Sequence, residues 1–473
     1  MEFQELPEDV IRSIFGCSDV YSVISLGGTN RYFHRLSMDK LVWVDLVVNL
    51  RRKGFIDRLS LSDIQSSSQE ALVALVKRSV TGPESWYGTV KPKSHWSRSS
   101  SHQTLIEMST KHTVHPGVIN TPSNLHAGLL NGGEYVLIDG VTIECWSVQR
   151  DKLVWTYDKN SPESFVEEFT AEVIEGGCSA NIMVCESLWT ASGKSGSLVQ
   201  IVGLDFDTGT STSLFVLPCP EVESYTNAKI CDDLASAVLD LGGTSYCLLM
   251  NWKTKAHLTV VPNARVSPLL VTLVPNHVIF LMSGTTGSPE IRIINSTALS
   301  PHWRLDTGHP ILNTVFPSQL DVILCEKITF EKCPYLRKPF QRKLYAYESP
   351  LQEGTYRIWI MLYGSSQSLL DVEGAICSYH FSLPNKVGDK ITWRQRTVFA
   401  TETSPSRSAL SYSGHTVRRF SRAGRSVFGP EDRVADLKPS SSALSPYTHV
   451  ATYSGALTSV DNRNNEVLIS YYT

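Results

Sequence analysis

The feature that most limits how this chain can fold is a recurring group of three β-rich runs, which begins after residue 119. In the first group, "EYVLI", "VTIECWSV" and "LVWTY" are separated by Asp139-Gly140 and by "QRDK". An Asp-Gly pair between such runs is a strong hairpin signal. The same order returns in three later stretches, which are "ANIMVCESLW" to "TSTSLFVL", "ASAVLDL" to "AHLTVV", and "HVIFLM" to "HWRLD". The recurrence predicts a series of antiparallel meanders.

The spacing of these groups is typical of a β-propeller. The middle-strand markers Trp146, Phe206, Trp252 and Ile294 lie about 40 to 60 residues apart, which fits four-stranded blades. Roughly 350 residues at that spacing give about seven blades, with six or eight left open, and a two-sheet sandwich is the competing architecture. The chain closes on "EVLISYY", which suits ring closure by a terminal strand. The Gly-His and Trp-Asp marks of WD repeats are missing, so the propeller is expected to be WD-repeat-like only distantly.

The bulk composition indicates a folded protein with more than one structural unit. At 473 residues, with 42% hydrophobic and 19% charged residues, the chain is too long for one small core and too apolar for global disorder. A net charge of -3 gives no general attraction to nucleic acids or anionic membranes. The ten cysteines form no Cys-x-x-Cys pair, so we expect reduced thiols, no metal, no cofactor, and a cytoplasmic or nuclear location.

The first fifty residues have a different, helical texture. Pro7 suits a first helical turn, and Val10 with Ile14 and Ile11 with Phe15 repeat at four residues, so two adjoining stripes are apolar. Further short helices follow, with caps expected at Ser18 or Asp19, Thr29 or Asn30, and Asp39. Helices this short are unstable alone. Their surplus of apolar faces predicts that residues 1–50 depend on a partner for order.

The stretch "LPEDVIRSIFGCSDVYSVISLGGTNRYFHRLSMDKLVWVDL" resembles an F-box, the helical module that docks on the Skp adaptor of SCF-type cullin–RING ubiquitin ligases. It departs from the family at Gly28-Thr29, where Val-Cys is common. The resemblance implies an adaptor-binding surface that is formed or shaped by Leu6, Pro7, Ile11, Ile14, Val23, Leu26, Phe33 and Trp43. The alternative is a helical cap that covers one end of the main domain.

These patterns predict an α+β multidomain chain with four segments. They are an all-α F-box over 1–50, a helical linker over 51–90, a polar linker or loop over 91–118, and a mainly-β propeller over 119–473. Within 51–90, Ser67 and Glu70 suggest a capping box. The F-box and the propeller are expected to have separate cores.

Motifs for catalysis are weak. "SGKSG" at residues 192–196 has Leu188 where a phosphate-binding loop needs its first glycine, so a hairpin loop is predicted. His112 and His115 form a lone His-x-x-His without a nearby acid in sequence. We therefore expect a non-catalytic protein, and a propeller enzyme whose site leaves no motif is the third alternative.

The expected function is that of a substrate receptor. The helices would bind the Skp adaptor and through it the cullin–RING ligase, and the propeller would bind an unknown protein client. The rival is a scaffold unconnected with ubiquitin. One candidate client site is the basic segment "GHTVRRFSRAGRSVFGPEDR", whose guanidinium groups suit phosphate or carboxylate. They converge only if the segment is mostly loop, and a solvated basic loop is the plainer interpretation. The arginines concerned are Arg418, Arg419, Arg422 and Arg425.

Overall fold

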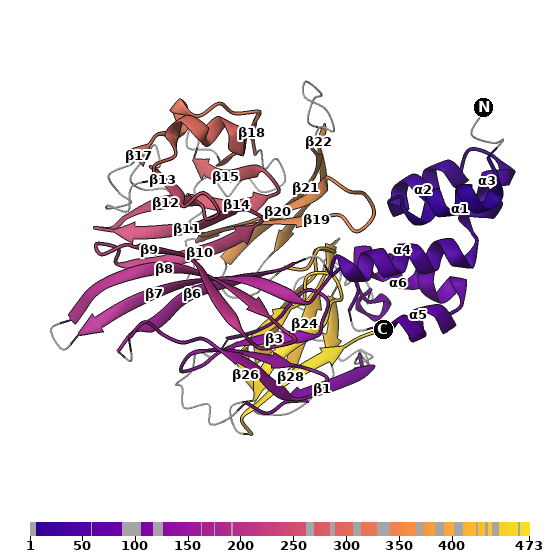
Figure 1. Ribbon diagram of the computed structural model, residues 1–473, viewed down its shortest axis with the longest axis horizontal. Coiled ribbons are helices and arrows are strands. Elements are labelled where there is room, and N and C mark those ends of the chain that lie inside the picture. The colour runs from indigo at the N-terminus through magenta and orange to yellow at the C-terminus, as the bar shows by residue number, and fades with distance from the viewer. Residues whose placement is uncertain are drawn as a thin grey trace.

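A helical domain precedes a ring of β-sheets (Figure 1). The computed structural model describes residues 6–57, 59–87, 106–116, 126–161, 163–174, 176–190, 193–261, 269–283, 289–305, 314–328, 341–365, 372–383, 392–401, 410–421, 424–430, 434–437, 444–461 and 464–473. The helices are α1 (Glu8–Gly16), α2 (Val20–Gly27), α3 (Arg31–Ser37), α4 (Lys40–Arg52), α5 (Leu61–Ser66), α6 (Gln69–Thr81) and the 3-10 helix η2 (Glu84–Trp86). No helix in the described ranges is long and apolar enough to cross a lipid bilayer.

Side-chain caps define where these short helices begin. Asp19, Asn30 and Asp39 each accept a hydrogen bond from a backbone N–H in the first turn of α2, α3 and α4, as the sequence predicts. The capping box predicted at Ser67 is wrong by one residue, because Ser68 caps α6 by accepting from the Ala71 N–H. Each cap satisfies a donor that the helix itself leaves unpaired.

Seven sheets of described strands follow, which confirms the predicted number of blades. The first sheet contains β2 (His126–Leu129), β3 (Tyr135–Asp139), β4 (Ile143–Ser147) and β5 (Lys152–Thr156), and the second contains β6 (Phe165–Val173), β7 (Ser179–Thr190), β8 (Gly193–Asp205) and β9 (Ser211–Pro218). The third contains β10 (Ser224–Cys231), β11 (Leu234–Leu241), β12 (Thr244–Asn251), β13 (Ala256–Val260) and β17 (Thr314–Val315). The fourth contains β14 (Leu270–Val274), β15 (His277–Ser283), β16 (Pro289–Asn295) and β18 (Leu324–Lys327).

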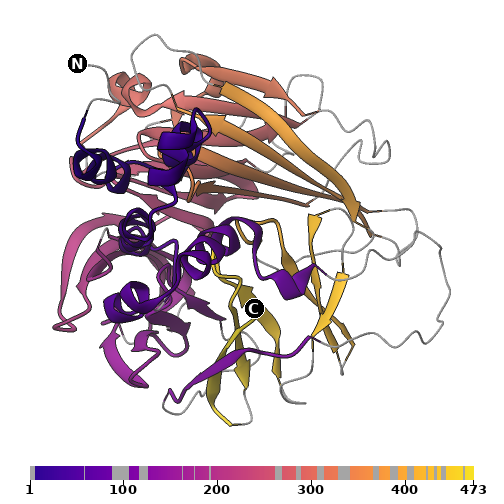
Figure 2. The ribbon, with the colours of Figure 1, turned by 90° about the vertical axis from the view of Figure 1, so that its right-hand side faces the viewer.

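The remaining sheets complete the ring. The fifth sheet contains β19 (Gln341–Glu348), β20 (Thr355–Ser365), β21 (Val372–Ser382) and β22 (Thr392–Thr401). The sixth contains β23 (Thr416–Ser421), β24 (Gly424–Phe428) and β25 (Val434–Leu437). The seventh contains β26 (Leu444–Val450), β27 (Leu457–Asp461), β28 (Glu466–Tyr471) and β1 (Thr110–Val114). Contacts between β6 and β10, β10 and β14, β14 and β19, and β2 and β26 place the first strands of these sheets around a common centre. Figure 2 looks onto the ring from the side of the helices.

The ring is closed by strands from distant parts of the chain. β1 pairs with β28 in antiparallel register from Thr110 opposite Tyr471 to Val114 opposite Val467. The carboxy-terminal strand therefore takes part in closure, as predicted. Its partner lies inside the predicted linker 91–118, so the propeller includes residues 110–114 as well as the region after 119.

The fourth predicted meander needs a correction. "HVIFLM" and "EIRIIN" are β15 and β16, but "HWRLD" is not their third strand. β18 takes that place, and a 3-10 helix, η3 (Ser296–His302), precedes Trp303. The chain leaves the sheet after Asn295, whose side chain caps η3 by accepting a hydrogen bond from the Thr297 N–H.

The helices and the propeller share one hydrophobic core, so the expectation of separate cores is wrong. Residues of α1 to α6 pack in the same buried cluster as Tyr412 and Tyr453 of the propeller. Phe55 meets Tyr453 edge-on, with ring centroids 4.8 Å apart. The Tyr21 N–H donates to the Leu351 carbonyl at 2.8 Å. The helices thus lie against one face of the ring, where the turns after the inner strands meet them (Figure 2).

Candidate functional site

The helical residues predicted to form an adaptor surface divide into buried and accessible sets. Ile11, Val23, Phe33 and Trp43 are buried in the shared core, and the indole N–H of Trp43 donates to the Ser37 carbonyl at 2.9 Å. These four side chains can position the residues of an adaptor-binding surface, but they are too buried to contact an adaptor themselves. The accessible set is Pro7 and Ile14, which are exposed, and Leu6 and Leu26, which are half-buried.

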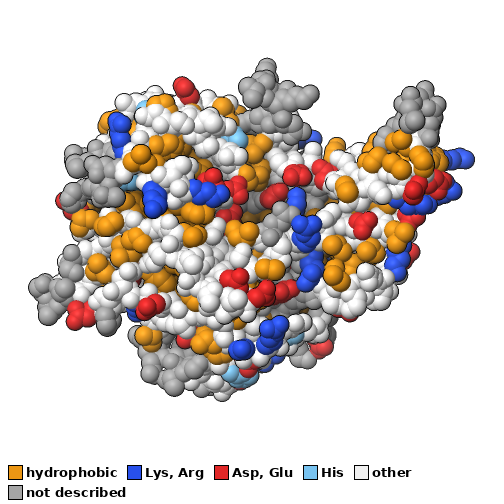
Figure 3. Space-filling view, viewed as in Figure 1, with side chains coloured by type: hydrophobic (Ala, Val, Ile, Leu, Met, Phe, Trp, Pro, Cys, Tyr) orange, Lys and Arg blue, Asp and Glu red, His pale blue; other side chains and the backbone are white. Residues whose placement is uncertain are grey.

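Several exposed apolar side chains in this region were not among the predicted contacts. Tyr21 and Ile24 of α2 are 53% and 54% exposed, and Leu41 at the start of α4 is 65% exposed. Val10 of α1 and Met38 before α4 are also exposed. The four-residue spacing of Val10 and Ile14 signals one of these stripes in the sequence, and the three-residue spacing of Tyr21 and Ile24 signals another. Figure 3 shows hydrophobic side chains gathered over this end of the helical domain.

Ion pairs hold this helical surface in shape. Arg12 of α1 contacts Glu8 at 3.1 Å and Asp39, the cap of α4, at 2.8 Å. Arg35 of α3 also contacts Glu8. Three elements are therefore linked beside the exposed apolar side chains, which fixes their relative positions although exposed pairs contribute little stability.

The basic segment near residue 420 is a hairpin and not a loop. Arg418 and Arg419 are consecutive positions of β23, and Arg419 is opposite Arg425 of β24. Adjacent positions of a strand alternate between the two faces of a sheet. Three of the four arginines therefore belong to strands and not to a loop. Arg422 lies outside the described residues, and client binding here stays a prediction.

The two weak catalytic motifs have structural roles. Gly196 pairs with Leu188 across the β7–β8 hairpin, and Lys194 forms an ion pair with Glu167 at 3.0 Å. His115 does have an acidic partner, since its Nδ1 lies 2.6 Å from Asp151 Oδ2 of the next blade. No cluster of metal-ligand side chains is found in the part of the chain that the structure describes.

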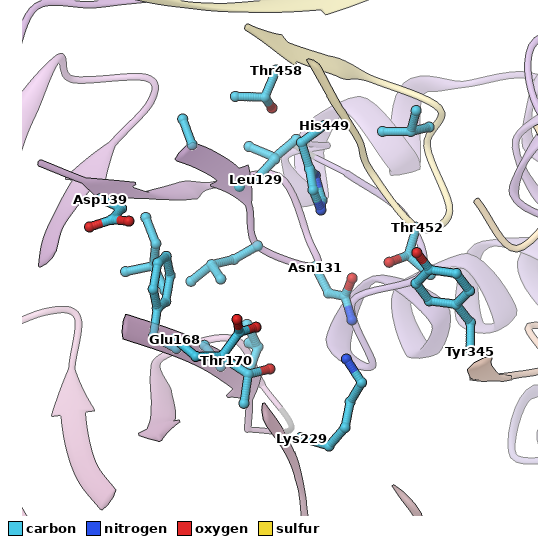
Figure 4. A pocket seen from close by; sticks show the side chains of 18 of the residues that line it. Leu129, Asn131, Asp139, Glu168, Thr170, Lys229, Tyr345, His449, Thr452 and Thr458 are labelled. Atoms are coloured by element: carbon cyan, nitrogen blue, oxygen red, sulfur yellow. The ribbon is translucent and has the colours of Figure 1, made fainter. Parts of the chain in front are cut away.

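The centre of the propeller contains a cavity of about 540 Å³. Such a volume lies within the roughly 300–1,000 Å³ of small-molecule sites. Its wall is built from the inner strands of several blades, and Figure 4 shows Lys229 and Asn131 directed toward each other, with Tyr345 and Thr452 beside them. Thr458 also lines the wall, and its buried Oγ1 has no hydrogen-bond partner among the described residues.

Three charged side chains line this cavity without an ion pair to another described residue. They are Asp139 at the end of β3, Glu168 on β6 and Lys229 on β10. Burial, with a smaller effect of the Glu168 charge, raises the pKa of Asp139 to about 7. Burial also raises the pKa of Glu168 and lowers the pKa of Lys229, and each charge only partly offsets the effect on the other. The cavity therefore holds charges that its own wall leaves poorly compensated.

Burial of Asp139 predicts a specific pH dependence of stability. Its pKa is about 7 in the folded protein and roughly 4 in the unfolded chain, so the folded state binds more protons between these values. The contribution of Asp139 to the free energy of unfolding is fully present at low pH. It is lost as the pH rises from the unfolded pKa of roughly 4 to the folded pKa of about 7. We expect Asp139→Asn to match the wild type near the unfolded pKa and to be more stable at neutral pH, by on the order of 1–3 kcal/mol.

Chemical denaturation of both proteins across this pH range measures the difference. Asp207→Asn, which changes an exposed aspartate, is the matched control and should follow the wild-type curve. A variant that is less stable than the wild type at neutral pH would show that ionised Asp139 is stabilised in the folded protein.

Comparisons with known proteins give no family. No family model matches the chain, and no curated protein matches it. The chain is similar to the β-propeller domain of Cps50 (Swd1) from Myceliophteria thermophila, with 11% identity, a TM-score of 0.44, and coverage of 77% of this chain and 100% of that one.

Two further solved structures have comparable similarity. The WD40 domain of SCAP from fission yeast is 9% identical, with a TM-score of 0.39 and coverage of 74% and 85%. An oligogalacturonate lyase from Vibrio parahaemolyticus is 9% identical, with a TM-score of 0.38 and coverage of 78% and 98%. Similarity this low carries no argument about function, and the propeller assignment depends on the sheet topology.

Proposed function

We propose that the chain is the substrate-recognition subunit of an SCF-type ubiquitin ligase. In this proposal α1 to α4 bind the Skp adaptor, and the propeller binds a protein client. The catalytic groups belong to other subunits, and this chain contributes proximity and orientation in the cytoplasm or nucleus.

The observation that supports this proposal most is the exposed apolar surface on α1, α2 and the start of α4. Ile14, Tyr21, Ile24 and Leu41 remain accessible although other apolar residues of α1, α2 and α4 are buried in the core shared with the propeller. Exposed apolar side chains that gather at one end of a domain, as Figure 3 shows here, are typical of protein interaction sites. Its residues fall within the stretch that resembles an F-box.

One observation favours a second candidate, a scaffold that has no connection with ubiquitin. The shared core that contains Tyr412 and Tyr453 means that the helices cover a face of the ring, as a cap would. A cap needs no adaptor, so binding of the adaptor distinguishes the two candidates.

The test is a binding measurement between the purified full-length chain and a purified Skp adaptor. We expect Ile14→Glu combined with Ile24→Glu to weaken binding at least tenfold, because a charge would enter an apolar contact. Leu61→Glu on α5 and Val141→Glu on the β3–β4 hairpin are matched controls, since both side chains are exposed and apolar. Absence of adaptor binding by the wild type would refute the proposal, as would full binding by the double variant in a folded state.

A further inference from the structure

The charged groups of the propeller cavity are separated along its length. Asp139 is the last residue of β3, a strand that starts beside the helices, where Arg51 of α4 contacts Glu134, and runs away from them. Lys229 lies near the end of β10, and the blades are related by rotation about the channel, so this strand end is on the helical side. Since each residue of a strand advances by about 3.3 Å, the acidic and basic groups are at different depths. In Figure 4 Asp139 is on one side of the cavity and Lys229 is on the other, with Glu168 between them.

This separation explains why the wall does not neutralise its own charges. Glu168 and Lys229 influence each other electrostatically but form no ion pair among the described residues, and the Lys159 charge only partly offsets the effect of burial on Asp139. A half-buried charge without a close partner is unfavourable, and a bound group of opposite charge reduces the penalty. One end of the cavity, at Asp139, therefore favours a bound cation, and the other end, at Lys229, favours a bound anion.

We propose that the channel binds a small zwitterion, with its ammonium group at Asp139 and its carboxylate at Lys229. The chemical class is that of amino acids and their straight-chain relatives. The cavity of about 540 Å³ has room for such a molecule.

Neutral groups of the wall complete the carboxylate end of this site. The Asn131 side chain points toward Lys229, and the hydroxyls of Tyr345 and Thr452 lie nearby (Figure 4). Amide and hydroxyl donors next to an ammonium are the usual partners of a carboxylate. Leu129 and Phe169 supply an apolar wall for the carbon chain between the two charged groups.

The charge pattern predicts that a ligand with two like charges binds more weakly than the zwitterion. A dicarboxylate would place one negative end against Asp139, and a diamine would place one positive end against Lys229. Like charges in a site of low dielectric repel strongly. Selectivity among molecules of equal length is therefore the property that identifies the site.

The experiment uses the purified full-length chain and three series of probes. The probes are ω-amino acids of increasing length and the dicarboxylates and diamines with the same numbers of carbons, and calorimetry measures their affinities. We expect at least one ω-amino acid to bind roughly tenfold more tightly than the dicarboxylate and diamine of its length. Equal affinities in all three series, or no binding by any ω-amino acid, would overturn the proposal.

Two variants test the assignment of each end. Asp139→Asn should weaken ω-amino acid binding about tenfold and shift preference toward the dicarboxylate, whereas Lys229→Met should shift it toward the diamine. Asp207→Asn and Lys152→Met change exposed residues outside the cavity and should leave affinities unchanged. A uniform loss of binding without the opposite shifts in preference would contradict the assignment. If a variant does not fold, the wild-type ranking of the probes still decides the proposal, which is independent of adaptor binding.

Discussion

Val114→Asp should open the propeller ring and lower the free energy of unfolding by about 3–5 kcal/mol. Val114 is fully buried in β1, where it pairs with Val467 of β28 in the core between the last and first blades. A carboxylate at this position has no cation to compensate it, so β1 must either detach or hold a buried charge. Detachment leaves the ring without its closing strand, which is why a single local change has a large effect.

Chemical denaturation followed by circular dichroism measures this loss. Thr110→Asp is the matched control, because Thr110 belongs to the same strand and is exposed. We expect the control to change stability by less than about 0.5 kcal/mol. Equal stability of the Val114 variant and the control would mean that β1 is not required to close the ring.

Trp86→Ala should have an effect of similar size, about 3–5 kcal/mol. Trp86 is fully buried in η2, the last described element of the helical region, and packs with Val417, Val427 and Tyr472 of the propeller. The Ser85 N–H next to it donates to the Thr473 carbonyl at 2.8 Å. Loss of the indole would leave a cavity where the helices, the last blade and its neighbour meet.

The matched control for this change is Trp189→Ala, since Trp189 is 44% exposed. It removes the same side chain from a position where much of its surface is already in water, so the cost should be near 1 kcal/mol. Thermal and denaturant unfolding of both variants give the comparison. A smaller effect at Trp86 than at Trp189 would refute the role of Trp86 as a joint between the two parts.

The propeller was predictable because its middle strands carry their signal locally. Strands such as "VLIDG" and "VTIECWSV" are short, apolar and bounded by turns, and the hydrogen-bonded neighbours of each are the next strands along the chain. Ring closure was foreseen from the carboxy-terminal strand. Its partner β1, "TKHTV", has few apolar residues, so no local pattern indicated that residues 110–114 belong to the propeller.

The features that sequence reasoning missed depend on contacts between distant residues. Tyr412 and Tyr453 complete the core under the helices, although no pattern in the sequence around them predicts a contact with the first eighty residues. The cavity charges are similar, because Asp139 was interpreted only as part of a hairpin turn and Glu168 and Lys229 belong to other blades. Helical periodicity indicated which residues are apolar but not which of their faces the propeller covers.

The shared core of helices and propeller has a consequence for the order in which the protein is made. A ribosome releases α1 to α6 before Tyr412 and Tyr453, which support them and which follow most of the blades in chain order. The growing chain must therefore carry partly uncovered apolar helices while nearly all of the blades are translated, and this is the stage at which aggregation or capture by a chaperone competes with folding. Completion of the blade that contains β26 to β28 is then the event that both closes the ring and gives α1 to α6 their final support.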